Sequence, residues 1–174
     1  MTPDAFRTGE SLLACCGLYC GACSFRVAFE ENDRRHLAGM PAKYDRYKDA
    51  PTDRCGGCRA AECGHGFTGC AAARGVEHCG QCDCFPCSRL REFARDGIPH
   101  HAGVIAGLER IRRVGERQWL LEQAAVWRCA CGVRLSWYRR TCDRCGRRAA
   151  VPGFEPEPER PAGRQAGPGA AAPP

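Results

Sequence analysis

Sixteen of the 174 residues are cysteine, whose thiolates are ligands for zinc and for the iron of iron–sulfur clusters. Only 8% of the chain is aromatic and the mean hydropathy is −0.44. This composition indicates that cross-links or metal sites, rather than apolar burial alone, hold the fold together. The cysteines form three groups, which run from Cys15 to Cys23, from Cys55 to Cys87 and from Cys129 to Cys145.

The last group has the spacing of a zinc ribbon, because two short cysteine pairs, each followed by a glycine, are separated by ten residues. A tetrahedral zinc ion with Zn–S bonds of about 2.3 Å requires the sulfurs of a pair to lie about 3.7 Å apart. Each glycine lets the backbone turn tightly enough for this. The residues between the pairs favour β structure and predict a hairpin. The predicted ligands are Cys129, Cys131, Cys142 and Cys145.

The first two groups predict further metal sites in a cysteine-rich core, but spacing alone does not determine which cysteines share a site. Neighbouring residues seldom bind one metal together, so we interpret Cys15 and Cys84 as structural or free thiols. Thiols are abundant here, so we favour them over His78 as ligands; Cys63 and His65 are additional candidates. The predicted ligands are Cys16, Cys20, Cys23, Cys55, Cys58, Cys70, Cys79, Cys82 and Cys87.

Metal binding is favoured over a disulfide scaffold because the N-terminus has no charged region followed by an apolar region, as a secretory signal would. We therefore expect a cytoplasmic protein that does not enter a membrane. Zn²⁺ is the expected cofactor, and a [4Fe–4S] cluster in the N-terminal core is the alternative. The spacing of Cys16, Cys20 and Cys23 is that of radical S-adenosylmethionine enzymes, but the long barrel that those enzymes need has no room in this chain.

Helical periodicity occupies the cysteine-free stretches. The apolar spacing predicts helices within 24–50, from Pro86 as the first helical residue, over 104–114 and around Trp119 and Trp127, and His36 is expected on an exposed helix face. The expected fold is a small, metal-stabilised, mainly α structure with short β-hairpins. Its predicted parts are a loose N-terminus (1–10), a cysteine-rich core (11–97), a helical segment (98–128), the zinc ribbon (129–148) and a disordered tail (152–174) rich in Pro, Gly and Ala.

The net charge of +6 comes from one segment, because residues 110–148 hold eleven arginines and three acidic residues. Arginine binds phosphate or carboxylate through two parallel hydrogen bonds. The segment therefore suggests contact with nucleic acid or an acidic protein, with Trp137 and Tyr138 as stacking platforms. A solvated basic face remains the alternative. The arginines proposed to contact nucleic acid are Arg134, Arg139, Arg140 and Arg144.

The motifs CCGLYCGAC (15–23), CGGC (55–58) and GCAAARGVEHCGQCDCFPC (69–87), with GERQWLLEQAAVWRCACG (115–132), resemble a prokaryotic family catalogued as domain of unknown function 3795. The resemblance spans roughly residues 15–131. It implies a cysteine-rich, metal-binding domain and no particular activity. In the family, a cysteine often stands where this chain has His65, so His65 or Cys63 would replace that ligand.

The sequence shows no Ser/His/Asp set, phosphate loop or paired carboxylates, so it names no catalytic residue. The main hypothesis is a non-enzymatic zinc-binding interaction module whose basic ribbon contacts nucleic acid. The alternatives are an iron–sulfur redox or maturation protein and a metal-handling or thiol-sensing protein.

Overall fold

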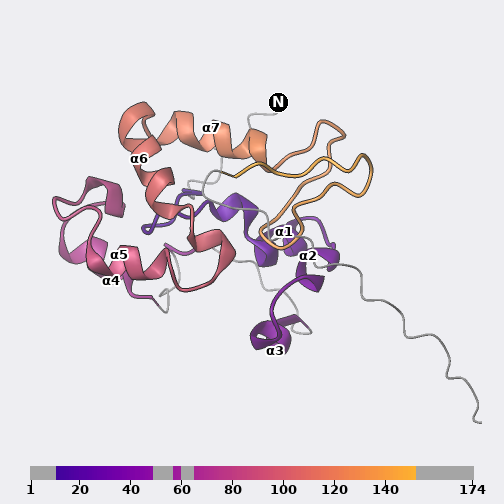
Figure 1. The fold of residues 1–174 in the computed structure, drawn as a ribbon, viewed down its shortest axis with the longest axis horizontal. Helices are drawn as coiled ribbons and strands as arrows, with labels where there is room; N and C mark the ends of the chain where they lie inside the picture. Colours follow the sequence, from indigo (N-terminus) through magenta and orange to yellow (C-terminus); the bar gives the residue numbers. More distant parts are fainter. Residues whose placement is uncertain (1–10, 49–56, 60–64, 152–174) are drawn as a thin grey trace, which may run out of the picture.

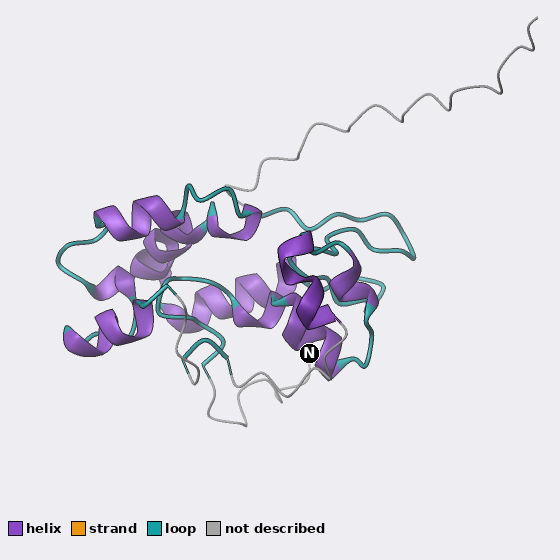
Figure 2. Cartoon of the chain, turned by 90° about the horizontal axis from the view of Figure 1, so that it is seen from below, coloured by secondary structure: helices purple, strands orange, loops and turns teal. Residues whose placement is uncertain are grey.

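The structure, a computed structural model, describes residues 11–48, 57–59 and 65–151, so the predicted loose N-terminus and disordered tail lie outside the described residues (Figure 1). The described chain is mainly helical, as expected (Figure 2). In it, no helix is both long and apolar enough to cross a membrane. The α-helices are α1 (Ser24–Glu30), α2 (Arg35–Ala38), α3 (Asp45–Lys48), α4 (Phe67–Ala73), α5 (Ser88–Phe93), α6 (Val104–Val114) and α7 (Glu116–Val126), and the 3₁₀ turns are η2 (Cys20–Ala22), η3 (Ala42–Tyr44), η4 (Cys79–Gln81) and η5 (Pro99–His101).

The predicted β-hairpins are not confirmed. Within the described residues the antiparallel pairing consists of isolated bridges and forms no strand. Three of these bridges lie in the C-terminal segment, where they pair Arg128 with Arg134, Ser136 with Arg139 and Thr141 with Arg148. The C-terminal segment therefore consists of turns that are joined at single points, and other contacts must hold its shape.

The two longest helices agree with the sequence periodicity. Helices α6 and α7 pack against each other and are separated by Gly115, whose positive φ of +81° is a backbone conformation that glycine adopts far more readily than other residues. Leu108 and Ile111 on α6 and Trp119 on α7 are buried. The apolar spacing was informative here because each helix is three turns long and buries one face.

Of two other helix predictions, one agrees with the structure and one needs correction. The helices expected within 24–50 are present over residues 24–48 as short pieces, and a new turn of helix begins after Pro41, so this prediction agrees with the structure. Pro86 is not the first residue of a helix. It follows a cis peptide bond with Phe85, and α5 begins at Ser88 with Cys87 as its N-cap. Apolar periodicity does not reveal a cis bond before proline.

A single hydrophobic cluster connects the three predicted parts of the ordered chain. It runs from Leu13 near the start, through Leu90 and Leu108, to Leu135 and Ala149 in the C-terminal segment. A smaller cluster of Ala28, Leu37 and Met40 lies between α1 and α2. The ribbon segment and the N-terminal core thus share one interior.

Gly17 lets the first cysteine loop approach α6 closely. Its φ is +95°, and a Cβ atom added there would lie 2.6 Å from Cγ of Leu108. Neither the backbone conformation nor the space tolerates a side chain. Gly17 therefore sets how closely the loop that carries Cys16 and Cys20 packs on the core.

We predict that Gly17→Ala destabilises the protein by about 2–5 kcal/mol, because left-handed strain of about 1–2 kcal/mol adds to overpacking of about 1–3 kcal/mol. Gly97→Ala is the matched control, since Gly97 has a φ of +81° but no atom within 4 Å of an added Cβ. Chemical denaturation of both variants measures the difference. Equal losses of stability would contradict the close packing on Leu108.

Candidate metal centre

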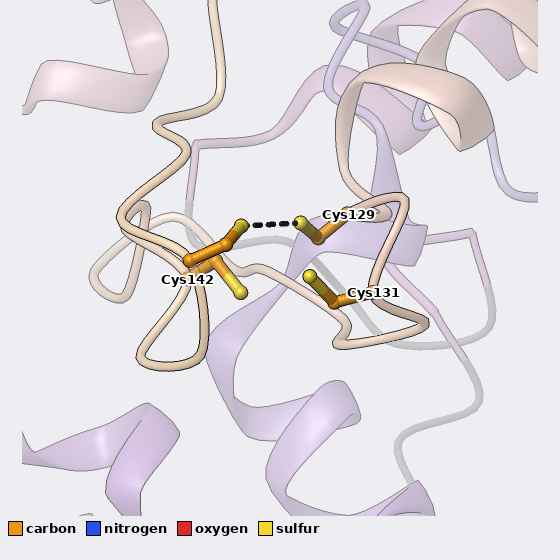
Figure 3. Close-up of side chains that lie close together, drawn as sticks. Cys129, Cys131 and Cys142 are labelled. Carbon is orange, nitrogen blue, oxygen red and sulfur yellow. Dashed lines mark hydrogen bonds between the residues drawn. The ribbon is translucent and has the colours of Figure 1, made fainter.

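The four ribbon cysteines come together in the structure. The sulfurs of Cys129, Cys131, Cys142 and Cys145 all lie within 4.8 Å of one another, and the Cys129 and Cys145 sulfurs are 3.3 Å apart (Figure 3). Four thiolates on a zinc tetrahedron lie about 3.7 Å apart. The separation in the structure therefore fits one metal ion bound by four sulfurs, and this cysteine cluster can bind a metal.

Glycine turns place the two cysteine pairs. The amide of Gly132 donates to the Cys129 carbonyl at 2.8 Å, and the amide of Gly146 donates to the Cys142 carbonyl at 2.8 Å. Both glycines have φ near the left-handed region, at +81° and +73°. Each turn folds the backbone back on itself, so the sulfurs of a pair point to one side. The first pair begins two residues after Trp127, the C-cap of α7.

The crowded sulfurs do not titrate independently. The backbone N–H of Cys131 and the Cys145 side chain hydrogen-bond the Cys129 sulfur and lower the pKa of that thiol to about 6. Contacts with Cys145 and Cys129 raise the pKa of Cys131 to about 12. One thiolate is favoured and further ones are opposed by repulsion, so a cation is required for all four to ionise.

A second group of sulfurs lies in the N-terminal core. A hydrogen bond from Cys58 lowers the pKa of Cys20 to about 7, and the same contact raises the pKa of Cys58. The charges of Cys16 and Cys23 raise the pKa of Cys58 further, so these predicted ligands lie near Cys58. Two other predicted residues, Cys55 and Cys63, lie outside the described residues.

The remaining predicted cysteines line a separate cavity. Cys70, Cys79, Cys82 and Cys87 lie around it together with Cys84. The candidate ligand His65 packs against the Phe93 ring, with ring centres 4.8 Å apart. The buried His78 accepts a hydrogen bond from the Gly80 amide at 3.1 Å.

The ribbon arginines make contacts within the chain. Arg134 pairs with Glu30 at the end of α1, and Arg139 donates to Asp33 at 2.9 Å and also pairs with Asp143. Arg144 donates to the Cys131 carbonyl at 3.1 Å. Arg140 is half-buried, and its carbonyl accepts from the Ala149 amide. At least two of the arginines proposed for nucleic acid therefore tie the ribbon segment to the N-terminal helices.

The aromatic residues of the ribbon segment also pack inward. The Trp137 ring stacks on His100 with centres 4.0 Å apart and planes 8° apart. Tyr138 meets the edge of the same imidazole at 5.5 Å. These rings are half-buried and serve as packing surfaces within the chain.

The expectation that His36 is exposed was wrong, since its side chain is 0% exposed. Its Nδ1 lies 2.9 Å from Ser136 Oγ, and its Nε2 lies 3.3 Å from Nη1 of Arg139. Because a guanidinium only donates, Nε2 accepts and Nδ1–H donates to Ser136. Ser24 also donates to Ser136, at 3.0 Å. No local pattern marks this buried network, because its partners are about a hundred residues apart.

We predict that stability falls as the pH drops from about 6.5 towards 4. Burial, followed by the charge of Arg139, lowers the pKa of His36 from 6.5 to about 4. In that window the unfolded chain binds a proton that the folded chain refuses, so unfolding becomes more favourable. The carboxylates of Glu31 and Asp33, each 3.9 Å away, offset only part of the effect.

The test compares unfolding free energies of the wild type and His36→Gln across this pH range, because other groups titrate alike in both. The wild type should lose stability more steeply, by at most about 1.4 kcal/mol per pH unit. Parallel pH profiles would show that His36 is not held neutral.

Comparison with known proteins covers the N-terminal part of the chain. Residues 12–92 match the model of a family described as "Protein of unknown function (DUF3795)". No curated protein and no solved structure matches the chain. The matched region contains the first two cysteine groups and none of the ribbon cysteines. The match supports the resemblance of the cysteine-rich core to this family of unknown function.

Proposed function

We propose that the ribbon cysteines bind one structural Zn²⁺ ion. The observation that carries this proposal is the convergence of four sulfurs within 4.8 Å. An all-thiolate tetrahedron is a preferred zinc environment, and it leaves no open position for water or substrate. A closed site of this kind supports a role in holding the fold rather than in catalysis.

The contacts around the ribbon explain what such an ion would stabilise. Between the two cysteine pairs, Leu135 is fully buried, and the amide of Trp137 donates to the Ala22 carbonyl at 2.9 Å. Zinc at the base of this segment would hold both residues against the N-terminal core. Within the described residues no disulfide joins any two cysteines, so their thiols remain available as metal ligands.

We predict that Cys142→Ser lowers the zinc content by one ion per chain and unfolds the 129–148 segment, because zinc binding is folding free energy for so small an element. Cys84→Ser is the matched control, since Cys84 is exposed and lies outside the ribbon. Metal analysis and limited proteolysis measure the two effects. Unchanged zinc content in Cys142→Ser would show that the ribbon is not the site.

We further propose that the protein is a non-enzymatic interaction module that contacts a polyanion, most simply nucleic acid. The exposed arginines of the second cysteine pair, Arg144, Arg147 and Arg148, support this role. Phosphate contact through Arg134 or Arg139 would instead require breaking ion pairs with Glu30 or Asp33. We therefore propose that the contact surface consists of the exposed arginines around Cys142 and Cys145, rather than of Arg134 and Arg139.

We predict that Arg144→Ala and Arg148→Ala each weaken binding to duplex DNA and make the salt dependence shallower, by about 0.9 for each phosphate that the variant no longer neutralises. Arg95→Ala is the control, because Arg95 is exposed but lies at the end of α5. Fluorescence titrations at several salt concentrations, with zinc content checked for each variant, provide the measurement. Absence of binding at low salt would favour an acidic protein partner.

A further inference from the structure

A third group of thiols, distinct from the ribbon and from the group around Cys20 and Cys58, surrounds a cavity. This cavity of about 270 Å³ lies between α4, η4 and the start of α5. Cys70 is on α4, Cys79 begins η4, Cys82 is the C-cap of η4 and Cys87 is the N-cap of α5. Three short elements thus deliver sulfurs to one space, and the nearby residues Phe67, Val76, Phe85 and Leu90 give it apolar walls.

Cys84 also lines this cavity but differs from the other four cysteines. It is exposed, whereas Cys70, Cys79, Cys82 and Cys87 are half-buried. Its sulfur lies 3.6 Å from Nη1 of Arg74, a hydrogen bond to an exposed guanidinium. Cys84 is therefore directed towards the rim, and the half-buried cysteines form a set of four.

The four half-buried sulfurs are near enough to influence one another. The cysteines near enough for their charge to act on Cys79 are Cys87, Cys70, Cys15 and Cys82. The positive charge of Arg74 lies beside the same group, where the charges of Cys82 and Cys84 raise the pKa of its guanidinium.

The spacing of these sulfurs differs from that of the ribbon. Among the described residues, the sulfurs of the ribbon cysteines lie within 4.8 Å of one another, as binding to one ion requires. The cavity sulfurs surround a larger space and do not converge in this way. In a [4Fe–4S] cluster each thiolate binds a different iron atom, so the four sulfurs stand farther apart than around one ion.

We propose that Cys70, Cys79, Cys82 and Cys87 hold a [4Fe–4S] cluster in this cavity. Four thiolates from three elements match the ligand number of the cluster, and the apolar walls limit its contact with water. Arg74 offsets part of the negative charge of the thiolate-bound cluster. This proposal is independent of the ribbon zinc, because the two sites share no residue.

The test is anaerobic reconstitution of the full chain with equal amounts of ferrous and ferric iron and with sulfide, followed by iron and sulfide analysis and visible absorption. We expect about four iron and four sulfide per chain in the wild type. Cys82→Ser should lose most of this iron, whereas Cys84→Ser should keep it. Cys142→Ser should lose zinc but keep iron, so failure at one site is distinguishable from failure at the other.

Alkylation of the reconstituted wild type avoids any folding defect of the variants. Cys84 should react at once, while the four proposed ligands should react only after the iron is chelated, as peptide mass spectrometry would show. The proposal is overturned if the wild type takes up no iron or if Cys82→Ser retains the cluster. It is also overturned if Cys84→Ser loses as much iron as Cys82→Ser. Loss of a zinc ion, instead of iron, from anaerobically purified Cys82→Ser would also overturn it.

Discussion

Four cysteine sulfurs meet within 4.8 Å beyond the end of α7, and thiolates at that separation repel one another unless a cation lies between them. The path of the C-terminal segment depends on this constraint. The segment has only isolated bridges, so backbone pairing alone does not define its shape. Closing the two cysteine pairs on one metal ion would fix both ends of the intervening loop and direct Leu135 into the shared core.

The loop between the two cysteine pairs also packs into the N-terminal core. Ser136 reaches into a buried space between α1 and α2, where Ser24 and His36 hydrogen-bond its hydroxyl group. Arg134 and Arg139 neutralise Glu30 and Asp33 at the edge of the same interface. The sequence suggests that these two arginines contact nucleic acid, but in the folded chain they form ion pairs within the protein. Their acidic partners are about a hundred residues away in the sequence and become neighbours only on folding.

Much of this arrangement follows from local patterns, and the rest does not. The periodicity of α6 and α7 and the spacing of the ribbon cysteines are both short-range, so the sequence was sufficient to predict two helices and a four-cysteine site. The burial of His36, the cis bond before Pro86 and the division of the N-terminal cysteines into two groups depend on how distant loops pack. Cysteine spacing carries no information about those contacts.

The central claim is that metal at the ribbon cysteines holds the C-terminal segment against the N-terminal core. Hydrogen exchange at the amides of Leu135 and Trp137 tests it most directly, since these amides donate to the Trp127 and Ala22 carbonyls at 2.8 and 2.9 Å. With metal bound, both amides should be protected; after chelation, both should exchange rapidly while Leu108 on α6 retains more protection. Unchanged protection of Leu135 and Trp137 after complete metal removal would contradict the account.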